Sequence, residues 1–306
     1  MRTRWVAVIV GTVFAMLVAG CGGSPLTPPT VKSLTASGAK AKLVASGLKF
    51  AEGPLWLPDG RLIVSDVLSK VVLALDAAGH KSDFRRPSNV ANGHALDSDG
   101  SVVEAEAGDS THHGLITRIA TDGSVTVLAD NFRGNRFNAP NDLIVKRDGT
   151  IWFTDPDFNE LFASEIGFKG VYRLDSQTKA VTLLTKTLSE PNGIAFSPDE
   201  KTLYVSDSQT GRLYSFPVAA DDTLGPGKEF GLGCDGVGVD EQGNVWASTC
   251  DQYVAITDPA GISIGAIAFP GTTTNLAWGG ADGKTLFVTT QEGGVYSLAL
   301  TVSETH

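Results

Sequence analysis

Short apolar runs separated by polar turns recur along most of this chain. Their Val, Ile, Phe, Trp and Thr residues come in bursts of four to six and not at helical spacing, which is typical of β-strands. The clearest repeat is a polar turn followed by an apolar strand. It occurs six times, as PDGRLIVSD (58–66), DSDGSVVEAE (97–106), KRDGTIWFTDP (146–156), SPDEKTLYVSD (197–207), DEQGNVWAST (240–249) and GADGKTLFVTT (280–290).

The spacing of this turn predicts the architecture. Its final position falls at residues 60, 100, 149, 200, 243 and 283, so the repeat length is 40 to 51 residues; Gly occupies five of these positions and Glu200 the sixth. Each unit also contains a second strand–turn–strand segment. Two hairpins per repeat of this length predict an all-β fold, a six-bladed β-propeller with four strands in each blade.

The two ends of the repeating region complement each other. The sixth unit stops after GGVYSLAL (293–300) and lacks an outer strand, whereas AKLVASG (41–47) precedes the first unit and resembles the outer strand VTVLADN (125–131). We therefore expect the N-terminal strand to complete the last blade and so remove an exposed sheet edge. A β-sandwich or a linear solenoid of hairpins is the alternative, and neither explains the complementary ends.

The first 39 residues have a different composition. Arg2 and Arg4 precede an apolar segment from Val6 to Val18, and LVAGC (17–21) resembles the lipobox of bacterial lipoprotein signal peptides. We expect residues 1–20 to be a signal peptide, Cys21 to be lipidated and residues 21–39 to form a flexible tether to residues 40–306. The protein would be exported and lipid-anchored at the cell envelope; an ordinary secretory signal is the alternative.

Charge excludes one class of partner. The chain carries 24 basic and 34 acidic residues, a formal charge of −10. A protein this acidic is poorly suited to bind nucleic acid or an anionic membrane surface. Contact with the membrane is expected only through the lipid.

The candidate site lies where the innermost strands begin. In a propeller these strands line the central channel, so residues at their starts meet near the axis although they are far apart in sequence. A carboxylate or amide occupies this position in every unit. Carboxylate and amide oxygens suit a hard divalent cation, with Ca²⁺ preferred here over Mg²⁺, Mn²⁺ or Zn²⁺. The six residues are Glu52, Asn92, Asn141, Asn192, Asp235 and Asn275.

These positions are not equivalent. Asn beside Gly is also a common turn former, and for Asn92 and Asn275 we favour that role or a supporting one. Glu52 precedes Gly-Pro and has no such turn chemistry, so it is a stronger candidate ligand. The histidines His94, His112 and His113 are interpreted as loop residues.

Four of these segments carry a family resemblance. AEGPLW (51–56), RFNAPNDLIVKRDGTIWFTDP (136–156), EPNGIAFSPDEKTLYVSDS (190–208) and CDGVGVDEQGNVWAS (234–248) resemble the gluconolactonase family, which includes senescence marker protein (regucalcin) and luciferin-regenerating enzyme. The resemblance extends over about residues 45–300. It implies a six-bladed propeller with one catalytic divalent metal in the central channel, and hydrolysis of a sugar lactone.

The resemblance also implies roles for single residues. Glu52, Asn192 and Asp235 match the family's metal ligands, Asn141 matches an Asn that contacts metal or substrate, and Arg136 matches an Arg that contacts substrate. Asp235 would in addition act as the general base for the attacking water. The chain departs from the family's motifs in two places. Cys234 stands directly before Asp235 where the family usually has Pro, and in the second blade Glu106 is followed by Ala where many relatives have His.

Other functions stay open at this point. The same scaffold could hydrolyse other lactones or organophosphate esters, or serve as a non-catalytic binding module. The chain has no G-x-S-x-G motif, and Cys234 and Cys250 have no evident His partner, so an acyl-enzyme route is disfavoured.

The two remaining cysteines fall in one predicted hairpin. With its turn near residues 241–243, Cys234 is expected opposite about residue 249, so a disulfide to Cys250 is conceivable in an oxidising compartment. The alternative is two separate small buried residues, because a shift of one residue would place the side chains on opposite faces.

Overall fold

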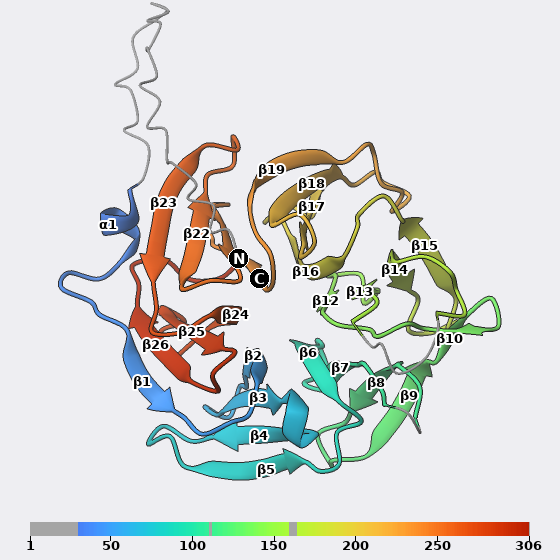
Figure 1. Ribbon diagram of the computed structural model, residues 1–306, viewed down its shortest axis with the longest axis horizontal. Coiled ribbons are helices and arrows are strands. Elements are labelled where there is room, and N and C mark those ends of the chain that lie inside the picture. The colour runs from blue at the N-terminus through green and yellow to red at the C-terminus, as the bar shows by residue number, and fades with distance from the viewer. Residues whose placement is uncertain (1–29, 110–111, 159–163, 306) are drawn as a thin grey trace, which may run out of the picture.

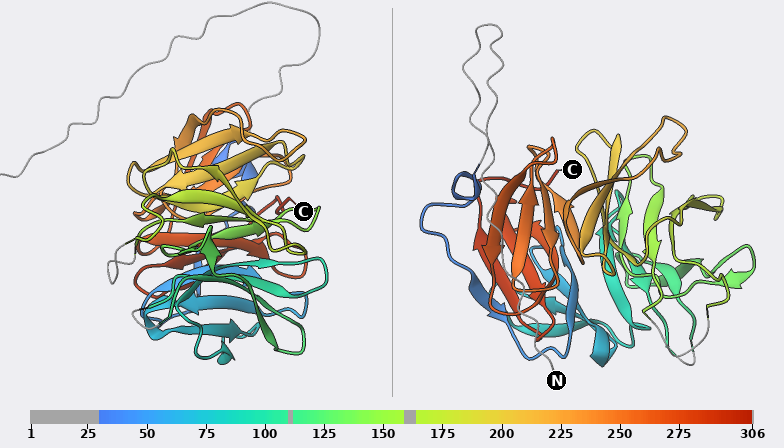
Figure 2. Two further views of the ribbon diagram at one scale, coloured as in Figure 1. Left: turned by 90° about the vertical axis from the view of Figure 1, so that its right-hand side faces the viewer. Right: turned by 45° about the horizontal axis from the view of Figure 1, so that its top comes forward.

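The computed structural model describes residues 30–109, 112–158 and 164–305, and these form a ring of six four-stranded antiparallel sheets (Figure 1). The predicted fold is therefore confirmed. Seen edge-on, the ring is a flattened disc (Figure 2). In five of the sheets the strands run outward from the axis in chain order, and in the sixth the outermost strand is β1. Among the described residues, no helix is long and apolar enough to cross a membrane.

The first three blades follow one another along the chain. Blade 1 contains β2 (Ala51–Trp56), β3 (Leu62–Asp66), β4 (Val71–Leu75) and β5 (Lys81–Arg85). Blade 2 contains β6 (Ala91–Leu96), β7 (Val102–Glu106), β8 (Leu115–Ile119) and β9 (Val125–Ala129). Blade 3 contains β12 (Leu143–Val145), β13 (Ile151–Asp155), β14 (Gly170–Leu174) and β15 (Val181–Thr185).

The remaining blades complete the ring. Blade 4 contains β16 (Pro191–Phe196), β17 (Thr202–Asp207), β18 (Arg212–Pro217) and β19 (Lys228–Leu232). Blade 5 contains β20 (Val237–Val239), β21 (Val245–Ser248), β22 (Tyr253–Thr257) and β23 (Ser263–Ala268). Blade 6 contains β24 (Thr273–Gly279), β25 (Thr285–Thr290), β26 (Val295–Ala299) and, as its outer strand, β1 (Lys42–Ala45).

The closing strand pairs as predicted. β1 is antiparallel to β26, with Lys42 opposite Ser297 and Leu43 opposite Tyr296. This pairing joins the first strand of the folded chain to the last one. As a result, blade 6 has four strands like each of the other blades.

The repeated turn has one backbone conformation in all blades. Gly60, Gly100, Gly149, Gly243 and Gly283 have positive φ angles, and Glu200 at the sixth position has φ of 56°. A left-handed residue is required here because the chain reverses tightly between the first and second strand, and Gly meets this requirement without strain. We call the face of the disc that carries these turns the turn face.

Buried aspartates at the ends of second strands hold the loops that lead into the channel. Asp155 accepts hydrogen bonds from the backbone N–H of Asn138 and Ala139 at 3.0 and 2.8 Å. Asp66 and Asp207 accept equivalent bonds from the loops of their own blades. Each aspartate thereby fixes the approach of the chain to the innermost strand.

The chain packs on the propeller before residue 40. The short helix α1 (Val31–Leu34) lies against β23, and its Leu34 is 1% exposed within the core of blades 5 and 6 (Figure 2). Thr35 also forms a β-bridge with Leu300. The predicted tether ended at residue 39, but its last ten residues are attached to the propeller here because Leu34 buries an apolar side chain. The predicted signal peptide and Cys21 lie outside the described residues.

Candidate site at the propeller axis

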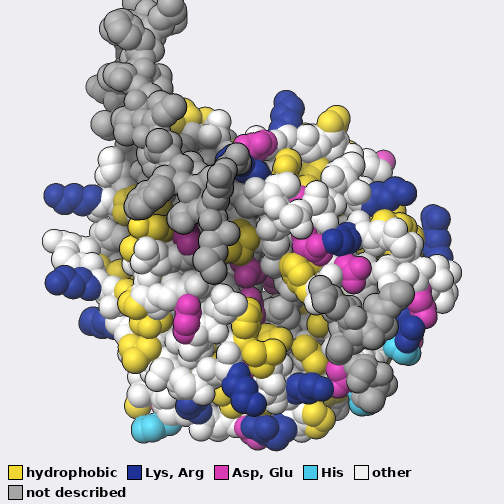
Figure 3. Space-filling model, in the orientation of Figure 1, with side chains coloured by type: hydrophobic (Ala, Val, Ile, Leu, Met, Phe, Trp, Pro, Cys, Tyr) yellow, Lys and Arg dark blue, Asp and Glu magenta, His cyan; other side chains and the backbone are white. Residues whose placement is uncertain are grey.

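The six residues predicted at the starts of the innermost strands form one layer around the axis, which we call the axial ring. Five are buried, and Asp235 is partly exposed to the channel. Acidic side chains are visible at the hollow centre of the disc in Figure 3. The members of the axial ring are Glu52, Asn92, Asn141, Asn192, Asp235 and Asn275.

Glycines allow neighbouring members of the ring to approach each other. A β-carbon at Gly53 would lie 1.8 Å from the carbonyl oxygen of Asn92, and one at Gly193 would lie 2.4 Å from that of Asp235. No side chain fits at such distances, so the Gly that follows four of the six ring residues is a requirement of the assembly. The E-G, N-G and D-G pairs of the sequence are thus contacts between blades.

Hydrogen bonds also connect one blade to the next at this level. The N–H of Gly93 donates to the carbonyl of Asn141 at 2.8 Å, and the hydroxyl of Thr274 donates to the carbonyl of Ala51 at 2.7 Å. The hydroxyl of Ser206 donates to the carbonyl of Asp235 at 2.6 Å. The ring residues are therefore held by backbone contacts that leave their side chains available.

Three carboxylates share this small volume. Burial, followed by the negative charge of Asp235, raises the pKa of Glu52. Burial, followed by the charge of Asp142, raises the pKa of Asp235, and burial raises that of Asp142 to about 6. Because three desolvated acids resist simultaneous ionisation, a cation between them would be stabilised strongly.

Amide oxygens complete a donor set for such a cation. The side-chain amide of Asn192 donates to the hydroxyl of Ser208 at 3.0 Å, which directs its amide nitrogen outward. Its buried oxygen Oδ1 has no hydrogen-bond partner among the described residues, and the same is true of Asn92 Oδ1. Unpaired buried oxygens beside carboxylates are what a hard divalent cation requires.

Carboxylates alone do not define a metal site here. Within the described ranges, no three Asp, Glu, His or Cys side chains are grouped so that they could hold an ion by themselves. A cation would therefore need amide oxygens as well. The predicted set of Glu52, Asn141, Asn192 and Asp235 fits this requirement, although only backbone contacts are recorded for Asn141, which donates to Thr154 O.

Asn275 and Asn92 differ in the hydrogen bonding of their side-chain oxygens. Asn275 Oδ1 accepts a hydrogen bond from the N–H of Leu276 at 2.7 Å, so its predicted local role is confirmed. Its side chain also lowers the pKa values of Glu52 and Asp142. Asn92 Oδ1 makes no such local bond, so the turn-forming interpretation does not describe it.

Sequence reasoning missed two residues near the ring. Asp142 directly follows the predicted ligand Asn141, but it was not predicted as a third carboxylate of the site. His94 was assigned to a loop, and that was wrong because it lies within β6 with a fully buried side chain. Its Nδ1 donates to the carbonyl of Gly53 at 2.6 Å. The two-residue period of a strand could have indicated that His94 shares a face with Asn92.

Arg136 lies at the outer part of blade 3 and pairs there with loop residues. It lies in a small hairpin of β10 (Asn131–Phe132) and β11 (Asn135–Arg136), where its guanidinium pairs with Glu165 at 2.6 Å and donates to His113 Nδ1 at 2.9 Å. His112 and His113 are loop residues, as predicted. Arg136 remains a candidate substrate contact on the loop side of the channel, which is the side opposite the turn face.

Glu106 of the second blade is also engaged elsewhere. Its carboxylate accepts hydrogen bonds from the guanidinium of Arg85 and the hydroxyl of Thr117, and Arg85 pairs with Glu104 as well. The side chains of both glutamates are fully buried. The two glutamates of blade 2 are thus paired with one guanidinium from β5 of blade 1.

Cys234 and Cys250 form a disulfide, with their Cα atoms 5.6 Å apart. β20 and β21 pair Val237 with Ala247 and Gly238 with Trp246, and the same register continued outward places Cys234 opposite Cys250. The sequence prediction placed residue 249 there, one residue short. Because Cys234 directly precedes Asp235, the disulfide restrains the backbone segment that carries the Asp235 side chain.

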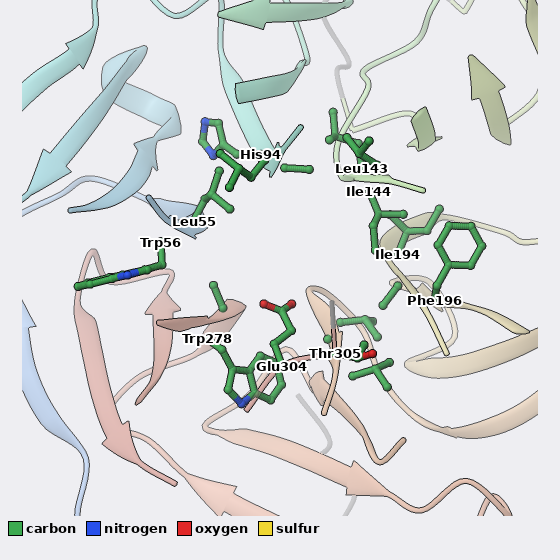
Figure 4. A pocket seen from close by; sticks show the side chains of 18 of the residues that line it. Leu55, Trp56, His94, Leu143, Ile144, Ile194, Phe196, Trp278, Glu304 and Thr305 are labelled. Carbon is green, nitrogen blue, oxygen red and sulfur yellow. The ribbon is translucent and has the colours of Figure 1, made fainter. Parts of the chain in front are cut away.

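A cavity of about 580 Å³ occupies the channel on the turn-face side of the axial ring (Figure 4). Gly53, His94, Asp142 and Asn275 bound it near the ring, and residues 304 and 305 reach it from the C-terminal segment. Its walls are the innermost strands beyond the ring. None of the described residues of the loops at 107–114 and 157–169 lines it.

The fold and site define a six-bladed propeller with carboxylates and amide oxygens gathered at its axis. Residues 50–292 match the SMP-30/gluconolactonase/LRE-like family, and the chain belongs to that family. A gluconolactonase from Zymomonas mobilis is 30% identical over 283 residues, which cover 81% of this chain and 78% of the relative.

Solved structures agree with this assignment. A gluconolactonase from Xanthomonas campestris is 32% identical, with a TM-score of 0.79 over 88% of this chain and 92% of that one. A calcium-binding protein, regucalcin, from Agrobacterium tumefaciens has a TM-score of 0.70 over 87% of this chain and 95% of its own, at 24% identity. At that identity the second likeness concerns the fold alone.

Proposed function

We propose that this protein hydrolyses a sugar lactone at the axial ring with the help of one divalent cation. The observation that carries the proposal is the convergence of Glu52, Asp142 and Asp235 with the unpaired oxygen of Asn192 at the axis. The relatives named gluconolactonase support the reaction class. The proposed ligands are Glu52, Asn141, Asn192 and Asp235, with Ca²⁺ as the preferred ion.

The cation, when bound, supplies positive charge that polarises the lactone carbonyl and stabilises the oxyanion that develops on it. The residues of the chain have separate tasks. Glu52 and Asn192 are held rigidly by their neighbours in the ring and give the site its fixed shape. Asp235 is the ring member that is partly exposed, so its carboxylate can accept a proton from a water molecule in the channel.

We place the lactone on the loop side of the ring, opposite the turn face. The loops of that side carry Arg136, whose guanidinium is already oriented by Glu165. Arg136 and Asn141 are the proposed substrate contacts. A guanidinium is suited to donate to the hydroxyl and carbonyl oxygens of a sugar lactone.

The proposal is tested by measuring hydrolysis of glucono-δ-lactone before and after chelation, and again after addition of Ca²⁺, Mg²⁺, Mn²⁺ or Zn²⁺. Asp235→Asn should abolish turnover while leaving the fold intact. Asp258→Asn is the control, since it replaces an exposed turn carboxylate of the same blade. Full activity of metal-loaded Asp235→Asn protein would overturn the assignment.

The same assay separates the alternatives. A panel of other lactones and of phosphate triesters, measured at fixed metal concentration, identifies another hydrolase on this scaffold. Tight binding of the cation without turnover of any ester would favour a binding module instead.

We also propose that the protein is exported and anchored by lipid at Cys21. The sequence from Arg2 to Cys21 supports this proposal. Incorporation of a labelled fatty acid into the wild-type chain, lost in Cys21→Ala, tests it. An unlabelled wild-type chain would favour an ordinary secretory signal.

A further inference from the structure

The C-terminal segment enters the channel from the turn face. Thr305 N–H donates to the carbonyl of Val239 at 3.0 Å, and Glu304 forms a β-bridge with Asp240. Val302 is fully buried in the core of blades 5 and 6, and Glu241 N–H donates to the carbonyl of Ser303 at 2.9 Å. The segment is therefore fixed on both sides of Glu304.

This attachment directs Glu304 into the cavity. In Figure 4 its carboxylate extends toward the middle of the space, between Leu55 and Ile194. The structure gives no hydrogen bond or ion pair for this carboxylate within the described part of the chain. Enclosure in the channel raises its pKa to about 7.

The other charged groups that line the cavity are already engaged. Asp97 pairs with Arg118, and Lys146 pairs with Asp148 and Asp222. Glu200 accepts the backbone N–H of Arg147, whose guanidinium donates to the carbonyl of Pro198. Asp142 accepts the N–H of Leu143, and His94 donates to Gly53. Among the described residues that line the cavity, none forms an ion pair with Glu304 in the structure.

The rest of the wall is largely hydrophobic. Leu55, Ile144, Ile194 and Phe196 line the space, and Figure 4 shows them around the carboxylate. Apolar walls favour a ligand with a hydrocarbon body, and a carboxylate in a low-dielectric enclosure favours a positive charge. One carboxylate is too few to hold a bare metal ion, which needs several oxygen ligands.

We propose that the turn-face cavity is a second small-molecule site, which binds an organic ammonium ion with a compact hydrocarbon body. Glu304 pairs with the ammonium group, and the side chains of β2, β12 and β16 surround the hydrocarbon. The site borders the axial ring at Asn275 but lies on the turn-face side of it, opposite the loop side where the lactone is placed. It requires no metal and no turnover.

The test is calorimetric titration of the full-length, calcium-saturated protein with cyclohexylammonium, and with cyclohexanol as the neutral probe of similar shape. We expect one cyclohexylammonium to bind per chain, at least tenfold more tightly than cyclohexanol. Glu304→Gln should weaken cyclohexylammonium binding at least tenfold and leave cyclohexanol binding unchanged. Ile144→Trp, which fills the cavity, should abolish binding of both.

Glu241→Gln is the matched control, because this exposed carboxylate contacts Ser303 of the same segment but does not line the cavity. It should bind cyclohexylammonium like the wild type. Unchanged affinity in Glu304→Gln would overturn the proposal, as would the absence of binding to the wild type. Binding to chelator-treated protein that is lost in calcium-saturated protein would place the ammonium at the axial ring and would also overturn it.

Discussion

A β-carbon at Gly236 would lie 2.1 Å from the side-chain oxygen of Asn275, in the neighbouring blade. The residue after Asp235 is therefore part of the contact between blades 5 and 6. We predict that Gly236→Ala lowers the free energy of unfolding by about 1–3 kcal/mol, because the crowded site must expand. It should also weaken cation binding, since Asp235 must move with its neighbour.

Thermal unfolding and calcium titration of the variant test this prediction. Gly225→Ala is a suitable control, because its β-carbon would meet only the side chain of Pro217 at 3.3 Å. Equal stability and calcium affinity of the Gly236→Ala and wild-type proteins would show that the ring tolerates a side chain here.

The two asparagines Asn192 and Asn275 should respond differently to removal. Asn192 has an unpaired oxygen, whereas that of Asn275 is bonded to Leu276 N–H. We expect Asn192→Ala to weaken calcium binding at least tenfold with little loss of stability. Asn275→Ala should instead cost about 1–3 kcal/mol of stability, because a buried backbone donor loses its partner.

Calcium titration and thermal unfolding of both variants give the comparison. If calcium affinity were lost only in Asn275→Ala, then Asn275 and not Asn192 would be the cation ligand, and the prediction would be wrong.

Stability of the chelator-treated protein should fall as pH rises. Burial raises the folded-state pKa values of Asp142, Glu304 and Asp155 to about 6, 7 and 8. Unfolded carboxyl groups titrate near ~4, so between about pH 4 and 8 the folded state binds more protons than the unfolded state. The free energy of unfolding then decreases with increasing pH.

Unfolding temperatures measured at pH 5, 6, 7 and 8 in chelator, with and without added calcium, test the sign of this dependence. Added calcium should reduce the decline, because it stabilises the ionised ring carboxylates. A Tm that rises steadily from pH 5 to 8 in chelator would contradict the prediction.

The disulfide between Cys234 and Cys250 should stabilise the whole ring as well as the segment before Asp235. Its cysteines are 16 residues apart in sequence. Replacement of both by Ser is expected to lower the free energy of unfolding by about 2–4 kcal/mol, because the unfolded chain gains freedom. Urea unfolding of the variant, compared with reduced wild type, checks this; equal midpoints for oxidised wild type and variant would contradict it.

The fold was predictable because its information is local and repeated. The turn residues from Gly60 to Gly283 recur at blade length, and each requires a left-handed backbone that the sequence marks with Gly in five cases. The closing strand at residues 42–45 was found because the last unit visibly lacked a partner. Neither inference needed knowledge of side-chain packing.

The site was predictable only in part. The starts of the strands identified Glu52, Asn192 and Asp235, but not which oxygens would be free. Whether Asn92 and Asn275 bond locally depends on the side-chain rotamer that each adopts against the neighbouring blade, which local sequence does not determine. The burial of His94 depends on which face of β6 meets blade 1.

Long-range packing explains the remaining differences. The segment that contains Glu304 enters the channel because Val302 is buried in the core of blades 5 and 6. The segment contacts Asp240 and Glu241, which lie more than 60 residues earlier in the sequence. Similarly, Arg136 pairs with Glu165, 29 residues away, and β12 and β13 lie between the two in the sequence.

The pairing of β1 with β26 sets the order in which the protein can fold. During synthesis residues 42–45 emerge early, but their partner strand at residues 295–299 emerges last. Blades 1 to 5 can form in sequence from local hairpins, whereas the sixth must wait for the end of the chain. Contacts of such wide sequence separation form slowly. Closure of the ring is thus expected to be the final step of folding, and until then the first strand is an unpaired edge open to pairing with other chains.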